Sequence, residues 1–83
     1  MFTTYIIYSK SIDQFYTGYT AGLLTDRLRR HNSNQKGFTG RTNDWEIVFS
    51  KQFTTKSEAI NFEKKIKSWK SKEKIKELIK TEN

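Results

Sequence analysis

Two short runs rich in aromatic and β-branched residues, at the start of the chain, constrain the fold most. They cover Phe2–Tyr8 and Phe15–Tyr19, and a mostly polar segment, residues 9–14, separates them. This arrangement is typical of a β-hairpin. Antiparallel pairing brings Tyr5 and Tyr16 near each other beside Gly18, and a glycine within a strand often marks a close approach by another group. Tyrosine is also simply common in strands, so the pair alone does not indicate a function.

The size and composition of the chain restrict both its architecture and its surroundings. With 83 residues we expect a single domain, 1–83, in which nearly every secondary-structure element contributes to one core. The chain has no cysteine, which excludes disulfides and thiolate metal sites and suits a reducing compartment. It has no apolar run of membrane-spanning length and no signal-peptide pattern. We therefore expect a cytoplasmic protein without a membrane partner.

The charge of the chain is strongly positive. The net charge is +7, with 16 Lys and Arg against 9 acidic residues, and residues 51–80 alone hold ten lysines against four glutamates. Such an excess favours a polyanion as partner, nucleic acid above all. A solvated, lysine-rich surface is the alternative explanation, so the charge alone favours nucleic acid only modestly.

A first helix is expected after the hairpin, over residues 23–31, following a short joint at residues 20–22. Its apolar stripe consists of Leu23, Leu24 and Leu28. At about 100° per residue, Arg27 and His31 fall inside the arc of these leucines, one turn apart, so their polar ends can meet in one small volume. Such a pair has two interpretations, a satisfied core pair or part of a functional site, and the sequence favours neither.

A long polar segment and a third strand follow. Residues 32–44 have the Asn, Ser, Gly and Asp composition of a loop, and Lys36 and Arg41 within it are candidates for contacting a phosphate backbone. An ordinary exposed connection explains them equally well. The segment 45–50 alternates like a strand and predicts one face with three apolar residues, opposite Val48. The three are Trp45, Ile47 and Phe49.

Two more helices complete the chain. A capping box that begins at Thr55 predicts the start of the second helix, and Glu63 falls among its apolar residues. A carboxylate that faces inward must be protonated, paired or bound to a cation. Its alternatives are an ion pair, with Arg27 or with Lys67 one turn further along, or a polar site shared with the first helix. A third helix, with Ser71 as candidate cap, packs through apolar residues. These are Ile75, Leu78 and Ile79.

The order of these elements and motifs resembles that of the GIY-YIG nuclease family, in particular its small single-domain bacterial members, which are related to the N-terminal domain of the excision-repair nuclease. The resemblance covers essentially the whole chain and rests on three segments, 15–20, 27–32 and 58–64, taken together. The first motif reads Thr3-Thr4-Tyr5 and lacks the usual Gly-Ile pair. The resemblance implies an α+β (α/β) fold: a small three-stranded antiparallel sheet flanked by three helices, in the order β-β-α-β-α-α.

The resemblance also implies roles for individual residues. Tyr5 and Tyr16 match the tyrosines of the two strand motifs, and Arg27 matches the helical arginine of the family. His31 matches its helical His or Tyr, and Glu63 matches its metal-binding glutamate. Lys67 is a further candidate for nucleic-acid binding, and Asn83 matches a late asparagine of many members.

The implied function is a metal-dependent endonuclease that hydrolyses phosphodiester bonds, in DNA rather than RNA, with one Mg²⁺ or Mn²⁺ ion on Glu63. Arg27 would hold the scissile phosphate, and Tyr5 or His31 would activate the water. The relatives suggest DNA repair, while a mobile-element role stays open, and no protein partner is implied. The alternative is a catalytically inactive nucleic-acid-binding module of the same fold.

Overall fold

The computed structural model describes residues 1–33 and 41–82 and contains the expected elements in the expected order. They are β1 (Phe2–Ser9), β2 (Gln14–Thr20), α1 (Leu24–His31), β3 (Trp45–Phe53), α2 (Lys56–Trp69) and α3 (Lys72–Glu82). The strands form an antiparallel sheet in the order β2-β1-β3. The predicted α+β fold is therefore confirmed.

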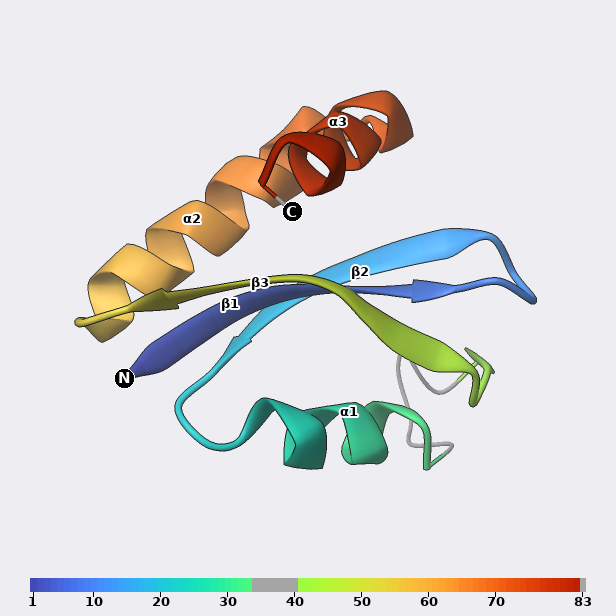
Figure 1. Cartoon of the computed structure of the whole chain (residues 1–83), viewed down its shortest axis with the longest axis horizontal. Coiled ribbons are helices and arrows are strands. Elements are labelled where there is room, and N and C mark those ends of the chain that lie inside the picture. The colour runs from blue at the N-terminus through green and yellow to red at the C-terminus, as the bar shows by residue number, and fades with distance from the viewer. Residues whose placement is uncertain (34–40, 83) are drawn as a thin grey trace.

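The sheet, with β1 at its centre, separates α1 on one face from α2 and α3 on the other (Figure 1). Because successive side chains of a strand point to opposite faces, Tyr5 and Ile7 lie on the face covered by α1, whereas Ile6 lies on the face covered by α2 and α3. All three are almost completely buried. The predicted hairpin pairs Tyr5 with Gly18 and Ile7 with Tyr16. The phenol of Tyr5 therefore belongs to the α1 side of the sheet.

The third strand, β3, differs from the prediction in its length and in the face of the sheet on which its side chains lie. It continues to Phe53, and its register against β1 shifts between Ile6, which pairs with Phe49, and Ile7, which pairs with Ile47. The extra residue, Val48, forms a β-bulge, which turns the side chains beyond it to the opposite face of the sheet. Ile47 consequently packs on the α1 side, and Phe49 packs on the α2 side. The prediction that both share one face was wrong.

Helix α1 is short and is fixed to the sheet at its C-terminal end. It begins at Leu24, and Leu23 is the N-cap residue with 70% of its surface exposed. The sequence prediction that Leu23 belongs to the apolar stripe was therefore wrong. At the C-terminal end, Asn32 donates through its side chain to the Trp45 carbonyl at 3.1 Å and accepts from the Trp45 amide at 2.7 Å. This pair of hydrogen bonds fixes the end of α1 against the start of β3.

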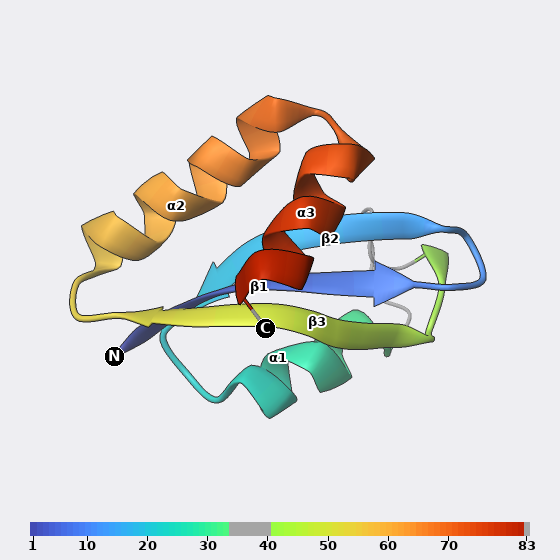
Figure 2. The same ribbon diagram turned by 45° about the horizontal axis from the view of Figure 1, so that its top comes forward.

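The other face of the sheet carries the two longer helices (Figure 2). The capping box predicted at Thr55 is present, with reciprocal bonds to Glu58, and starts α2 at the following residue. Thr4 of β1 donates to the carbonyl of Ala59 at 2.8 Å, and this bond ties the first turn of α2 to the central strand. Helix α2 ends at Trp69, and the left-handed backbone of the C-cap residue Lys70 turns the chain toward α3.

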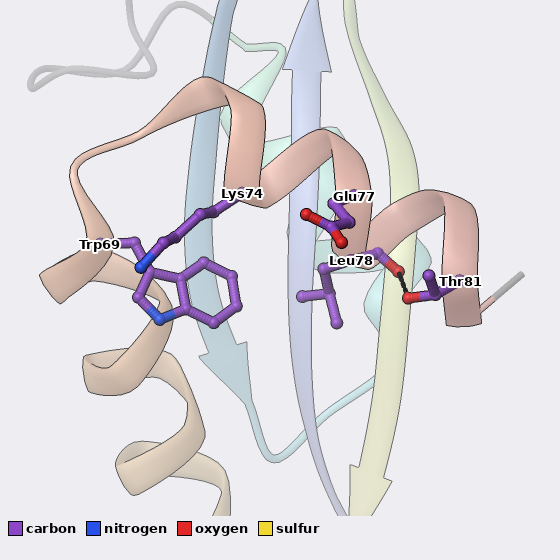
Figure 3. Close-up of a pocket in the computed structure, with 5 residues that line it drawn as sticks. All are labelled: Trp69, Lys74, Glu77, Leu78 and Thr81. Atoms are coloured by element: carbon purple, nitrogen blue, oxygen red, sulfur yellow. Dashed lines mark hydrogen bonds between the residues drawn. The ribbon is translucent and has the colours of Figure 1, made fainter.

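Helix α3 crosses the sheet at an angle to α2 and leaves a hollow of about 350 Å³ between the two helices (Figure 3). Trp69 at the end of α2 forms one side, and residues of α3 form the other, namely Lys74, Glu77, Leu78 and Thr81. The predicted apolar triad of α3 packs onto the same cluster as Ile6. In the described parts of the chain, no helix has the length and apolar character needed to cross a membrane.

Candidate active site

The Tyr5 phenol reaches past the edge strand at the one position where that strand has no side chain. Tyr5 pairs directly with Gly18, and a Cβ atom at Gly18 would lie only 2.7 Å from Tyr5 Oη and 2.9 Å from Cζ. It would also lie 3.3 Å from the ring of Tyr16. The glycine therefore makes room for the phenol, which is the close approach that the sequence indicated at this position.

Three ring side chains gather around this position. Tyr5 Oη and His31 Nε2 share a hydrogen bond of 2.8 Å. The rings of Tyr16 and His31 are 5.2 Å apart between centroids, and those of Tyr5 and His31 are 5.8 Å apart. His31 comes from the last turn of α1, so the hairpin and the first helix meet here.

The surroundings change the acid–base properties of two of these groups. Burial raises the pKa of the Tyr5 phenol well above its ordinary value, and the charge of Arg27 opposes this rise while that of Glu63 adds to it. Burial also lowers the pKa of His31, and the nearby charge of Arg27 lowers it further. At neutral pH the site therefore holds a neutral phenol hydrogen-bonded to a neutral imidazole.

Arg27 lies one turn before His31 on α1 and is half-buried. Among the described residues it has no salt-bridge partner. Together with Arg30 it lines a polar hollow of about 310 Å³ between the end of β2 and the start of α1. A guanidinium placed in this way can grip a phosphate with two parallel hydrogen bonds.

Glu63 of α2 faces inward, with 14% of its side chain exposed, and forms an ion pair of 3.0 Å with Lys67. The Lys67 ammonium also lies 5.3 Å from the centre of the Tyr16 ring. Of the alternatives left open by the sequence, the ion pair with Lys67 is thus present. The shared polar site has support as well, since the charges of Glu63 and Arg27 both act on the pKa of Tyr5.

The rings of Tyr5, Tyr16 and His31 therefore lie together at the edge of the sheet, and the charges of Arg27 and Glu63 both act on the Tyr5 phenol. A family model of the GIY-YIG catalytic domain matches residues 1–76. The chain belongs to the GIY-YIG family. No curated protein and no solved structure matches the chain significantly. Since GIY-YIG domains are nuclease domains, the fold is a nuclease fold, and nucleic acid is the substrate class it implies.

GIY-YIG nucleases are generally dependent on a divalent metal ion. Within residues 1–33 and 41–82, no three His, Asp or Glu side chains gather closely enough to hold an ion. Mg²⁺ and Mn²⁺ nevertheless fit a site with one carboxylate, because they keep several waters and take oxygens from the phosphate. Glu63 would be that carboxylate once Lys67 had moved off it.

The remaining predicted residues divide into two groups. Arg41 is exposed on the segment that precedes β3, and Lys67 is half-exposed beside Tyr16. Lys36 and Asn83, both predicted from the sequence, lie outside the described residues. Sequence reasoning missed the positioning role of Asn32, which follows His31 directly. Its signal was present, because asparagine often occurs where a helix ends and can bond nearby backbone groups.

Proposed function

We propose that this GIY-YIG domain is a metal-dependent endonuclease that hydrolyses phosphodiester bonds in DNA. The observation that carries the proposal is the 2.8 Å hydrogen bond between Tyr5 Oη and His31 Nε2, at a site where the charges of Arg27 and Glu63 both act on the phenol. Hydrolysis needs an activated water, stabilisation of the phosphoryl charge and help for the departing 3′ oxygen. These residues provide a group suited to each need.

The pairing of Tyr5 with His31 suits proton transfer from water. A phenol with a raised pKa is not ionised at neutral pH, so Tyr5 cannot act as a base by itself. In the tautomer of His31 with an unprotonated Nε2, the Tyr5 hydroxyl donates to that nitrogen. Tyr5 can then take a proton from the attacking water while it passes its own proton to His31, and the hydroxide attacks the phosphorus as the bond to the 3′ oxygen breaks. The departing 3′ oxygen takes up a proton from solvent, and His31 releases its extra proton to solvent.

The other residues bind and orient the substrate. Arg27 would hold the scissile phosphate through its forked donors, and Tyr16, beside His31, would orient the water. Glu63 would hold one Mg²⁺ or Mn²⁺ ion. When bound, such an ion stabilises the charge on the phosphoryl oxygens and on the leaving oxygen.

A second candidate function is a nucleic-acid-binding module without turnover, and the ion pair between Glu63 and Lys67 favours it. With Lys67 as its partner, the inward carboxylate is already neutralised and needs no metal. The basic surface and Arg27 would then bind nucleic acid in the same way. The two functions differ in whether Glu63 is needed for bond cleavage.

The test is to incubate the purified protein with plasmid, branched DNA and RNA, with Mn²⁺ or with a chelator, beside Glu63→Ala and Tyr5→Phe. We expect DNA cleavage only with the metal, and losses of about 100-fold or more in both variants, the size typical of removing a general base or a metal ligand. Full cleavage by Tyr5→Phe would refute the role of Tyr5. Binding without cleavage of any substrate would favour the second candidate.

A further inference from the structure

Lys67 makes two contacts that no assigned role explains. Its ammonium lies 3.0 Å from a carboxylate oxygen of Glu63, and it also lies 5.3 Å from the centre of the Tyr16 ring. The two partners come from different elements, α2 and β2. Lys67 therefore occupies the space between the carboxylate and one of the rings of the site.

The position of Lys67 places it in competition with a metal ion. Glu63 is mostly buried, with 14% of its side chain exposed, whereas 49% of the Lys67 side chain is exposed. The buried carboxylate needs a positive partner more than the lysine does. A divalent ion that binds to Glu63 cannot share this short contact with an ammonium, because the two positive charges would repel each other strongly at such a distance.

We propose that Lys67 is the resident counterion of Glu63, which a divalent ion has to displace, so that the free protein binds the ion weakly and DNA and metal bind cooperatively. The inference rests on the proposed role of Glu63 as the metal ligand. It assigns to Lys67 the control of metal affinity, in addition to the nucleic-acid contact predicted from the sequence.

The structure also provides a place for the displaced side chain. Lys67 and Lys70 lie at a hollow of about 250 Å³ beside the edge strand, whose other lining includes Phe15, Tyr16 and Thr17. A side chain that is half-exposed and unbranched can turn into this space without disturbing the helix. A phosphate group near Tyr16 would then serve both cations, as an oxygen ligand for the metal and as a new partner for Lys67. DNA therefore lowers the cost of displacing Lys67.

The experiment measures Mn²⁺ binding to the free protein by the loss of the paramagnetic resonance signal of the free ion, at constant ionic strength. Lys67→Met removes the competing charge, and we expect it to tighten Mn²⁺ binding about three- to tenfold, the range for an ion pair that is partly exposed. Lys67→Arg keeps the charge and should stay close to wild type. Lys64→Met is the matched control, because it removes the same charge from an exposed position of the same helix.

A second measurement tests cooperativity by the affinity for a labelled duplex, with and without Mn²⁺, in proteins that carry Tyr5→Phe to prevent cleavage. Because coupling between two ligands is reciprocal, the factor by which Mn²⁺ strengthens duplex binding equals the factor by which the duplex strengthens Mn²⁺ binding. Lys67→Met should reduce this factor by the same three- to tenfold by which it tightens Mn²⁺ binding to the free protein.

The possible outcomes distinguish the role of Lys67 from the proposed metal site on Glu63. Mn²⁺ binding that changes less than twofold in Lys67→Met, or equally in Lys64→Met, would overturn the role of Lys67. Glu63→Gln, measured in parallel, tests the metal ligand itself, and unchanged Mn²⁺ binding there would reject the proposed metal site. Loss of binding in Glu63→Gln together with no effect of Lys67→Met would reject the inference alone.

Discussion

Gly18 is the position where a single methyl group should disturb both the stability of the domain and its candidate site. In a Gly18→Ala protein the new Cβ atom would lie 2.7 Å from Tyr5 Oη and 2.9 Å from Cζ. The Tyr5 ring is 2% exposed and packs in the same cluster as Ile7 and Trp45, so it cannot easily turn aside. The strand, the ring or both must shift, and the hydrogen bond to His31 shifts with them.

The expected loss follows from two opposing effects. Overpacking of a filled core costs about 1–3 kcal/mol. Replacing glycine by alanine also restricts the unfolded chain, which restores about 0.4–1 kcal/mol. The free energy of unfolding should therefore fall by about 1–2 kcal/mol, and the melting temperature of a domain of this size by roughly 4–16 °C.

Thermal unfolding followed by circular dichroism measures this loss, and Gly22→Ala is the matched control. A Cβ atom at Gly22 would lie 3.9 Å from Thr20 Oγ1, an ordinary contact on an exposed joint, so its stability should stay within about 0.5 kcal/mol of wild type. Tyr5→Phe removes the nearest atom and should cost less in the Gly18→Ala protein than in wild type. Equal melting temperatures for the two alanine variants would refute the reasoning.

Two further predictions concern charged groups of the site. The pKa of His31, the only histidine of the chain, should lie below 6.5, because burial and then the charge of Arg27 lower it. Stability should fall as the pH drops from 6.5 through the pKa of folded His31, since the unfolded chain binds the proton more readily. The cleavage rate should fall as well, because a protonated His31 cannot accept the proton of Tyr5. A pKa of 6.5 or more for His31 in an NMR titration would contradict this. Arg30→Gln should weaken DNA binding and reduce the slope of log affinity against log salt by about 0.9, because Arg30 lines the hollow that holds Arg27. Arg29→Gln, exposed and paired with Asp26 at 3.9 Å, is the control, and equal slopes for both variants would indicate a general charge effect.

Much of the fold could be predicted because local patterns and the final structure agree. The hairpin followed from two aromatic runs, the start of α2 from the capping box at Thr55, and the inward direction of Glu63 from its apolar neighbours on the helix. The closeness of Tyr5 to Gly18 followed from strand pairing alone. These features depend on residues within one element or on two adjacent strands.

The remaining features depend on contacts between distant segments, which periodicity does not contain. The bulge that moves Phe49 to the α2 side is set by the pairing of β3 with β1, and alternation within β3 gives no sign of it. Leu23 fits the helical stripe but lies before the first turn, where the chain leaves the sheet. The helical wheel allowed two partners for Glu63, and it could not include Tyr16 of β2, whose ring lies beside the Lys67 ammonium that pairs with Glu63.

Helices α1 and α2 are held to the sheet by different amounts of buried side chain, so they should unfold locally at different free energies. Helix α1 carries Arg27 and His31 but has no fully buried residue, whereas α2 buries Ala59 and Ile66 against the sheet. Backbone amides of α1 should therefore exchange with solvent deuterium through partial unfolding, while β1 and α2 stay protected until the whole domain unfolds. The helix that bears the basic pair should therefore open at a lower energy than the central strand and α2. A nucleic-acid strand bound across it would slow that exchange.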